Sequence, residues 1–484
     1  MKEYSTNNFS ANNFAKQDCR LALEQKYLNL ITFDDSINRQ FVSNQLNKKQ
    51  PFYGWFKYKE AFSSELVKKF IIDFEIKKDS IVLDPFIGSG TAAFVCKNLG
   101  IHCLGFDILP ITKIIINVKD NIFNFQIDKL IDIYNKFLTI KPEIIGNLKL
   151  NTVKITEFAY PEKNERYFAY ITELIKNFQY PEIYKNLLTL AVLSSLEECS
   201  YTEKAGQYLK WDSRSQKVIN FNKRRKNPLK PYCTRQNISY ARDSFLKNLR
   251  NIIQDIVNLQ NNRKQDNFGK ISFFQNSCLF ELPLLDDNSI DAVITSPPYC
   301  NRYDYTRTYA LELAYLGLSE SEIKELRQKL ISCTVENKDK TTTIENFYTQ
   351  HGLTKHFAYI KEIIDTNQTF LEIINSLKLR EKNNDLNNKG IIKMVYGYFT
   401  ELCFIYAELY RICKKGAKVI FVNDNVRYGG EVIPVDFLSC DFAESFGFRI
   451  KKIYSLKQMK GNSSQQMAKF GKVPLRKSIT VWEK

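Results

Sequence analysis

The feature that most constrains the fold is a glycine-rich stretch, DPFIGSGT, at residues 84–91. A short apolar segment before it, residues 80–84, predicts a buried strand. Residues 91–99 have the pattern of a helix, which Gly100 suits as a terminator, and residues 101–107 predict a second strand. A strand, a tight turn, a helix and a second strand form the opening of a βαβ unit, so we predict a parallel sheet.

Strands and helices continue to alternate along the chain, which predicts an α/β fold with a mixed, mostly parallel sheet. A capping-box pattern at Ser319 and Glu322 starts a predicted helix over 319–332, and a long amphipathic helix covers 393–415. Two long segments, 110–270 and 319–390, carry few strand signals and are expected to be helical insertions. The further predicted strands are 270–275, 289–295 and 417–424, with 448–456 and 477–483 as a closing antiparallel hairpin.

The glycine loop has the properties of a cofactor site. Gly88 and Gly90 let a ligand approach the backbone, and Asp107 ends the next strand, where an acid commonly binds ribose hydroxyls. With Ala93 the two glycines also satisfy the dinucleotide fingerprint, so the loop alone fits a nicotinamide cofactor and S-adenosylmethionine equally. Asp84 favours S-adenosylmethionine, because an acid there can pair with its α-amine but would repel a pyrophosphate.

A second motif, Ser296-Pro297-Pro298-Tyr299, directly follows the predicted strand 289–295. Ligands of open α/β sheets bind at the carboxyl ends of strands. The two prolines fix the backbone, which leaves their carbonyls as rigid acceptors, and the tyrosine supplies a flat surface. This combination can hold a planar amine, whereas a dehydrogenase has no use for it. Alone it would indicate only a proline-rich loop, but here it coincides with a strand end and a glycine loop.

Charge is concentrated in one segment of the chain. The net charge is +17, of which residues 201–250, with 13 Lys or Arg and 3 acids, carry +10. Its centre is Lys223-Arg224-Arg225-Lys226. Basic side chains with aromatic neighbours are typical of nucleic-acid contact, although a solvated loop is the alternative. We therefore predict that this cluster binds DNA.

Cysteine and histidine usage limits other chemistries. The eleven cysteines include no C-x-x-C pair, and there are only three histidines, so neither a disulfide scaffold nor a metal site is expected. The sequence also lacks the run of roughly 18 apolar residues that a membrane helix needs. We expect a protein of the reducing cytoplasm, without membrane attachment.

DPFIGSGT and TSPPY together resemble the cofactor and catalytic motifs of bacterial amino-methylating (cytosine-N4 or adenine-N6) DNA methyltransferases of type II restriction–modification systems. Residues 51–63 and 282–313 are similar to the family over longer stretches. The resemblance implies a Rossmann-like S-adenosylmethionine-dependent methyltransferase fold, double-stranded DNA as substrate, and a base flipped out of the duplex. It also implies a cognate restriction endonuclease acting on the same site without a stable complex. We expect a monomer.

Carried over by position, the resemblance implies cofactor contacts and base contacts. A serine before Pro-Pro-Tyr usually marks cytosine N4 in the family, and Asp or Asn usually marks adenine N6, so N4-methylcytosine is the expected product. The alternatives are an adenine-N6 enzyme, an RNA amino-methyltransferase and a non-catalytic DNA-binding protein. The implied cofactor residues are Asp84, Phe86, Gly88, Gly90 and Asp107, and the implied base-binding residues are Ser296, Pro297, Pro298 and Tyr299.

Two departures from the family pattern affect these expectations. The cofactor motif precedes the catalytic motif by about two hundred residues, whereas many relatives have the reverse order, so the place of target recognition does not follow from the resemblance. Asn276 stands where relatives often carry an acid that binds the cofactor adenine, and we expect its side-chain carbonyl to do so. We divide the chain into 1–120 with the cofactor motif, 121–269 as a helical and basic insertion for target recognition, and 270–484 with the catalytic motif and an insertion at about 319–390.

Overall fold

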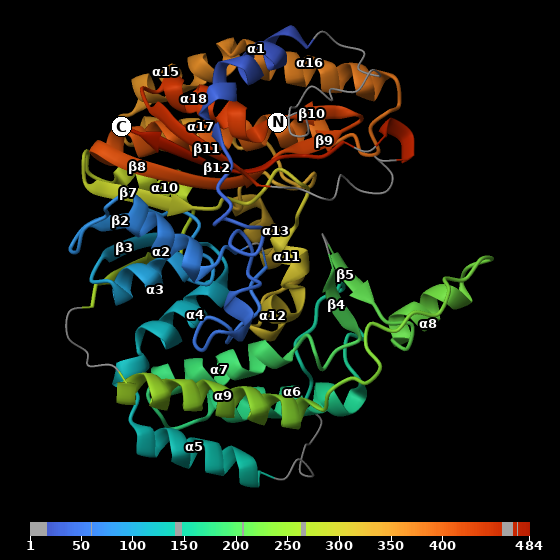
Figure 1. Cartoon of the computed structure of the whole chain (residues 1–484). Coiled ribbons are helices and arrows are strands. Elements are labelled where there is room, and N and C mark those ends of the chain that lie inside the picture. The colour runs from blue at the N-terminus through green and yellow to red at the C-terminus, as the bar shows by residue number, and fades with distance from the viewer. Residues whose placement is uncertain are drawn as a thin grey trace.

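The computed structural model of the chain describes residues 17–484, apart from residues 60, 141–147, 206–207, 263–267, 457–467 and 472. Its centre is an eight-stranded sheet in the order β1-β11-β12-β8-β7-β2-β3-β6 (Figure 1). The strands are β1 (Ile31–Thr32), β2 (Ile81–Asp84), β3 (His102–Phe106), β6 (Ile271–Phe274), β7 (Ile290–Thr295), β8 (Cys413–Asp424), β11 (Arg449–Leu456) and β12 (Lys477–Glu483).

All neighbouring strands of this sheet are parallel except at β12, which is antiparallel to both β8 and β11. The predicted closing hairpin is therefore confirmed, with Leu456 opposite Lys477. Five residues of the central strand β7 are buried, as expected of a strand covered on both faces. The predicted α/β fold with a mixed, mostly parallel sheet is confirmed.

The order of the strands creates a switch point between β2 and β7. From β2 the chain moves outward to β3 and β6, then returns to β7, which pairs with β2 through Leu83 and Val293. From β7 it continues in the opposite direction to β8. Ligands of such sheets bind where the strand order reverses. The two sequence motifs, far apart in the chain, thus begin at neighbouring strand ends.

Helices from different parts of the chain pack on this sheet. On the β2 side, α2 (Ser64–Asp73) packs on α3 (Thr91–Asn98), which contacts β2, β3 and β6. On the β8 side, α18 (Val435–Ser445) contacts β8, β11 and β12, and α17 (Ile391–Ile412) packs on α18. The insertion 319–390 consists of α13 (Glu320–Lys329), α14 (Thr341–Gln350), α15 (Thr354–Thr366) and α16 (Gln368–Lys382). α15 and α16 pack against α17, and the N-terminal helix α1 (Asp18–Tyr27) lies on α16 and α18 (Figure 1).

The insertion 121–269 forms a helical bundle on the other side of the molecule (Figure 1). Its main helices are α5 (Ile127–Thr139), α6 (Glu162–Lys176), α7 (Glu182–Ser195) and α9 (Ala241–Asn262). The bundle is joined to the sheet through α4 (Pro110–Asp120), which contacts both α7 and β6. The buried residues of bundle and sheet belong to one continuous core. Within the described ranges, no helix has the length and apolarity needed to cross a membrane.

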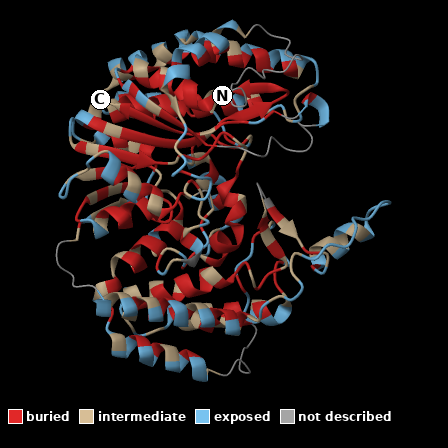
Figure 2. Ribbon diagram, in the orientation of Figure 1, coloured by how far each residue is buried: buried red, intermediate tan, exposed pale blue. Residues whose placement is uncertain are grey.

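One part of this insertion leaves the bundle. A short hairpin, β4 (Thr202–Ala205) and β5 (Tyr208–Trp211), leads to helix α8 (Gln216–Lys223) and an extended loop. We call residues 202–235 the arm. Figure 1 shows α8 and the loop projecting from the molecule, and Figure 2 shows that the outer part of the arm is mostly exposed. The sequence pattern did not predict the β4–β5 hairpin.

Candidate active site

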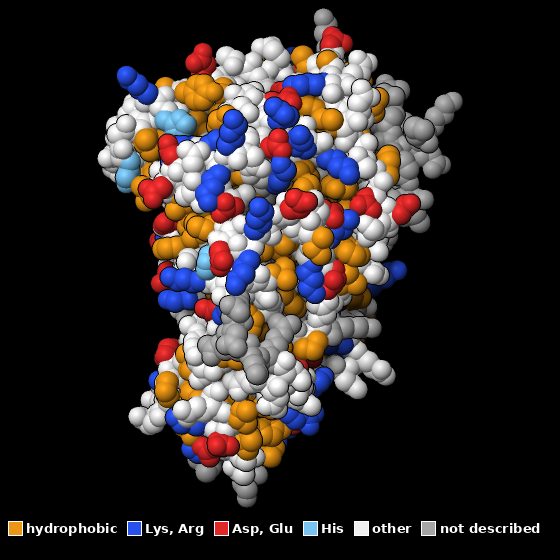
Figure 3. Space-filling view, turned by 60° about the vertical axis from the view of Figure 1, so that its left-hand side comes forward, with side chains coloured by type: hydrophobic (Ala, Val, Ile, Leu, Met, Phe, Trp, Pro, Cys, Tyr) orange, Lys and Arg blue, Asp and Glu red, His pale blue; other side chains and the backbone are white. Residues whose placement is uncertain are grey.

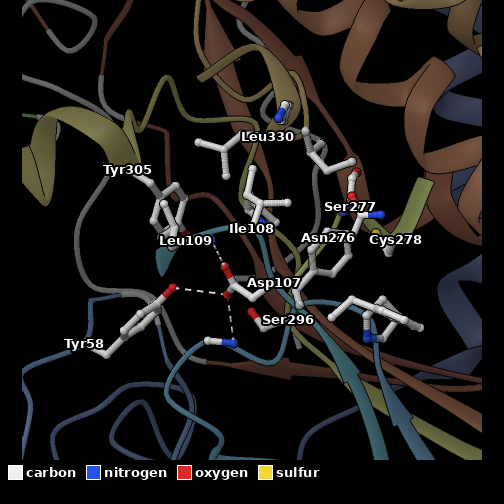
Figure 4. Close-up of a pocket in the computed structure, with 17 residues that line it drawn as sticks. Tyr58, Asp107, Ile108, Leu109, Asn276, Ser277, Cys278, Ser296, Tyr305 and Leu330 are labelled. Carbon is white, nitrogen blue, oxygen red and sulfur yellow. Dashed lines mark hydrogen bonds between the residues drawn. The ribbon is translucent and has the colours of Figure 1, made fainter. Parts of the chain in front are cut away.

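A pocket lies at the carboxyl ends of the strands around the switch point (Figure 4). Both sequence motifs contribute to it, together with the residues that follow β3 and β6. Its wall also contains apolar side chains, among them Phe106, Ile108 and Leu109. The predicted site residues that line this pocket are Phe86, Gly88, Asp107, Asn276, Ser296 and Pro298.

The two loop glycines are required by the backbone and by packing. Gly88 and Gly90 have φ angles of +50° and +80°, in the left-handed region that L side chains rarely adopt. A Cβ atom on Gly88 would lie 3.0 Å from the Tyr58 ring, and one on Gly90 would lie 2.5 Å from Ile116. Gly90 is also the N-cap of α3 and does not line the pocket. Its role is therefore to shape the turn, while Gly88 borders the ligand space.

Asp107 is held in place by three hydrogen bonds. Its carboxylate accepts from the backbone N–H groups of Gly88 at 3.1 Å and Leu109 at 2.8 Å, and from the Tyr58 hydroxyl at 3.5 Å (Figure 4). Burial raises the pKa of Asp107 to about 6, although these hydrogen bonds oppose the shift. A carboxylate fixed in this way at a pocket wall can accept hydrogen bonds from ribose hydroxyls.

Tyr58 is a site residue that the motifs did not reveal. Its ring borders the pocket and packs against Gly88, and its hydroxyl reaches Asp107. The available signal was the family-like stretch 51–63, which contains it.

Asp84 lies at the end of β2, as predicted, and is buried. It does not line the pocket; it is 1% exposed and accepts hydrogen bonds from Thr295 Oγ1 at 2.7 Å and from the Phe86 N–H at 3.1 Å. Burial raises its pKa to about 7. Because Thr295 immediately precedes Ser296, this bond ties the glycine loop to the Ser-Pro-Pro-Tyr loop. No ion pair to Asp84 occurs among the residues that the structure describes.

Asn276 lies at the end of β6, as predicted, and borders the pocket (Figure 4). Its side-chain oxygen accepts from the Ser277 N–H at 2.9 Å, and its amide group donates to Glu281. An amide oxygen has two lone pairs, so a second donor can still reach it. The side chain is thus held in one orientation at the pocket edge.

The Ser-Pro-Pro-Tyr loop is mostly buried. The Ser296 hydroxyl lies 3.2 Å from the Val422 carbonyl and 3.2 Å from the Tyr299 hydroxyl. Tyr299 is 4% exposed and does not line the pocket, while Ser296 and Pro298 do. Pro297 lies buried between them. The loop therefore presents its serine to the pocket, with the tyrosine ring behind it.

Lys477, the first residue of β12, packs on this tyrosine. Its ammonium lies 4.8 Å from the Tyr299 ring centroid, 3.3 Å from the Tyr299 hydroxyl and 3.2 Å from the Asp424 carboxylate. A chain of polar contacts thus runs from Ser296 through Tyr299 and Lys477 to Asp424 at the end of β8. Nothing in the local sequence around Lys477 indicated this contact.

Comparisons with known proteins agree with this geometry. Residues 20–117, which include the glycine loop, match the sequence profile of a DNA methylase family. The type II methyltransferase M.BsoBI of Geobacillus stearothermophilus is 49% identical over 486 residues, spanning 100% of this chain and 95% of that protein. The type II methyltransferases M.AvaI of Anabaena variabilis and of a Nostoc species are each 40% identical over 473 residues, spanning 96% of this chain and 92% of those proteins.

The chain belongs to the type II amino-methylating DNA methyltransferases. The predicted family is thereby confirmed, and the protein is an enzyme that transfers a methyl group to DNA. The match to the family profile ends before the Ser-Pro-Pro-Tyr loop, whereas the alignments to the relatives span nearly the whole chain.

Cys300, which follows the methyltransferase's Ser-Pro-Pro-Tyr loop, is fully buried. Burial raises the pKa of its thiol, which disfavours the thiolate that nucleophilic attack requires. Its backbone carbonyl accepts a hydrogen bond from the Tyr428 hydroxyl at 2.6 Å. This environment fits a structural cysteine and agrees with direct transfer to an exocyclic amine.

The basic cluster of the methyltransferase lies at the tip of the arm. Lys223, Arg224, Arg225 and Lys226 are all exposed, at the end of α8 and in the loop that follows. Several other basic residues of 201–250 have structural roles instead. Lys204 forms a buried ion pair with Glu312. Figure 3 shows a different face of the molecule, on which basic and acidic side chains are interspersed.

Proposed function

We propose that this methyltransferase transfers a methyl group from S-adenosylmethionine to the exocyclic amine of a base flipped out of double-stranded DNA, with N4 of cytosine as the target. The observation that carries the proposal is the meeting of the glycine loop and the Ser-Pro-Pro-Tyr loop at one pocket. The bond from Thr295 to Asp84 fixes the two loops relative to each other. The adenine-N6 reaction is the alternative, since it would use the same pocket.

The pocket residues fit S-adenosylmethionine. Asp107 would accept the ribose hydroxyls, Asn276 would meet the adenine, and Phe86 and Gly88 would border the remainder. The acidic group of Asp107 at the pocket wall favours a cationic ligand over a pyrophosphate. When bound, the cofactor supplies a methyl group on a positively charged sulfur.

The Ser-Pro-Pro-Tyr loop would hold the target base. The Ser296 hydroxyl and the Pro297 carbonyl accept the protons of the base's amino group, which directs the nitrogen lone pair towards the methyl group. Tyr299 would supply the ring on which the base stacks. Positioning of the two reactants supplies most of the rate acceleration. No covalent enzyme–base bond is needed.

The serine before Pro-Pro-Tyr supports N4 of cytosine as the target, because serine at this position usually marks cytosine-N4 enzymes in the family that the chain resembles. The basic arm supports duplex DNA, and the eleven free thiols agree with a reducing cytoplasm. We further propose that the enzyme acts as a monomer and protects sites that a separate cognate endonuclease would cleave.

Incorporation of a labelled methyl group tests the proposal. Wild-type protein with labelled S-adenosylmethionine should label duplex DNA and leave an RNA transcript of the same sequence unlabelled. Ser296→Ala should retain the fold and label the duplex more slowly. Labelling of the transcript in preference to the duplex would make the protein an RNA methyltransferase.

A further inference from the structure

Helix α8 is a folded element of the arm that burial does not stabilise. None of its eight residues, Gln216–Lys223, is buried. An isolated helix of this length is marginally stable in water, because the free-energy cost of nucleation exceeds the stabilisation that two helical turns contribute. Its start is fixed by Ser215, whose side chain accepts from the Val218 N–H. Figures 1 and 2 show it standing away from the core.

The base of the arm, in contrast, is firmly held. Asp212 is fully buried and accepts from the backbone and guanidinium of Arg214 and from the Thr234 N–H. The Arg235 guanidinium donates to the carbonyls of Glu197, Ser200 and Thr202. The Asp212 bonds tie the two ends of the arm to each other, and the Arg235 bonds join it to the segment that follows α7. The exposed helix is therefore carried on a rigid support.

The β4–β5 hairpin at the base of the arm also contacts the segment that follows the Ser-Pro-Pro-Tyr loop. Strand β5 contacts α11 (Tyr305–Thr308), which begins six residues after Tyr299. Lys204 of β4 makes its buried ion pair with Glu312 of α12 (Ala310–Tyr315). A ligand bound by α8 would thus have a defined position relative to the pocket.

One face of α8 carries a distinctive stripe of side chains. Lys217 points to the body of the protein, where its ammonium donates to the carbonyls of Lys154 and Ile155. The residues at i, i+3, i+4 and i+7 from Gln216 share another face. That stripe consists of Gln216, Ile219, Asn220 and Lys223, with Gln216 donating to the Asn220 side-chain oxygen at 2.7 Å.

We propose that α8 enters the major groove of the DNA and that Gln216 and Asn220 read base edges there. The inference rests on the proposed function, because it assumes that duplex DNA is the substrate. The major groove admits an α-helix, and Asn and Gln are suited to paired hydrogen bonds with adenine, as Lys is with guanine. Residues 213–232 contain seven basic residues and no acid, which matches a phosphate backbone rather than a protein surface of mixed charge.

Residues at different positions along the arm would have different roles in DNA binding. Arg224, Arg225 and Lys226 lie beyond the end of α8 and would contact phosphates, which fixes the depth and register of the helix. The exposed apolar side chains Ile219 and Phe221, 37% and 49% exposed, would meet thymine methyl groups or sugars. Sequence reading and phosphate contact are thus assigned to different residues of one arm.

The test compares specificity with affinity. The methylated sequence is first identified by sequencing DNA from a host that expresses the wild type. Methylation rates are then measured on a duplex carrying that sequence and on duplexes with each single base pair changed. Gln216→Ala and Asn220→Ala are compared with Lys226→Ala, and Gln179→Ala, an exposed glutamine outside the arm, is the matched control.

At least one of the two α8 variants should lower the preference for the methylated sequence over a single-pair variant by about tenfold, at defined base positions. Lys226→Ala should weaken binding to all duplexes alike and flatten the salt dependence of binding by about one unit. Gln179→Ala should change neither quantity. Unchanged preferences in both α8 variants, or an equal loss on every duplex, would overturn the inference and leave the methyltransferase function standing. Absence of DNA methylation by the wild type would overturn both.

Discussion

The pocket and the arm differ in how their functional residues are held. Asp107 and Ser296 in the pocket, and Asp84 beside it, each have neighbours that fix their orientation, and most of the surrounding side chains are buried. On the arm, the cluster Lys223–Lys226 is fully exposed and only the base is fixed. In the proposed function, the chemistry would depend on preorganised geometry, whereas DNA contact would depend on charge presented to solvent. Substitutions in the two regions should therefore affect different measurements.

Neutralising the arm cluster should have the largest effect. Replacing Lys223, Arg224, Arg225 and Lys226 together by glutamine should reduce DNA affinity and flatten the slope of log affinity against log salt by about three to four units, because each lost phosphate contact removes about one. S-adenosylmethionine binding, measured by calorimetry, should stay unchanged. An unaltered salt slope would mean that the cluster is only a solvated surface.

Removing the Asp107 carboxylate should affect the pocket alone. Asp107→Ala should weaken S-adenosylmethionine binding by at least about a hundredfold, since two hydrogen bonds to a charged acceptor are lost at roughly 1.5–3 kcal/mol each. DNA binding should not change. Asp286→Ala, which alters an exposed acid that does not line the pocket, serves as the control. Unchanged cofactor affinity in Asp107→Ala would remove this residue from the site.

Substitutions in the Ser-Pro-Pro-Tyr loop should lower the methylation rate and leave the affinity for the cofactor unchanged. Tyr299→Ala removes a stacking surface worth roughly 1–3 kcal/mol, so kcat/KM on DNA should fall by about ten- to a hundredfold. Ser296→Ala should cause a smaller loss, because the Pro297 carbonyl remains as an acceptor. Tyr299→Phe, which keeps the ring, separates stacking from the contact to Lys477. Normal rates in Tyr299→Ala would exclude stacking on this ring.

Cofactor affinity should also depend on pH. Burial raises the pKa of Asp107 to about 6 and that of Asp84 to about 7, so both are partly protonated below these values. A cationic ligand favours the ionised forms, and therefore S-adenosylmethionine should bind several-fold more tightly at pH 7.5 than at pH 5.5. Asp107→Asn should make the profile flatter. Tighter binding at the lower pH would contradict the assignment.

The smallest expected effect is at Cys300. Cys300→Ser should leave the methylation rate within about twofold of the wild type, because the buried thiol takes no part in the transfer proposed. A folded Cys300→Ser protein without activity would indicate attack by a thiolate and would exclude the mechanism.

Local sequence patterns predicted much of the fold and the motifs of the site. β2, β7 and β12 appear where apolar runs indicated strands, and the capping box at Ser319 starts α13. The βα turns at residues 84–91 and 295–299 carry their signals within a few residues. That is why the family, too, could be predicted from two short motifs.

Contacts between distant segments could not be predicted in this way. Tyr58 reaches Asp107 across 49 residues, and Lys477 reaches Tyr299 across 178. The strands of the β4–β5 hairpin have only four residues each, TEKA and YLKW, and no alternation of polar and apolar residues that would separate them from a loop. Asp84 accepts a hydrogen bond from Thr295 of the neighbouring strand, across 211 residues. Such pairings are set by the sheet order, which no local pattern contains.

The most direct test of the central claim is mass analysis of nucleosides from duplex DNA that the wild-type enzyme has methylated with S-adenosylmethionine. We predict N4-methylcytosine as the product, with the same assay on Ser296→Ala giving less of it. N6-methyladenine would correct the base while keeping the transfer to an exocyclic amine. Detection of 5-methylcytosine would contradict the account, because methylation at carbon requires covalent attack on the ring by a nucleophile such as a thiolate. Cys278 lines the pocket, but burial raises the pKa of its thiol and disfavours the thiolate.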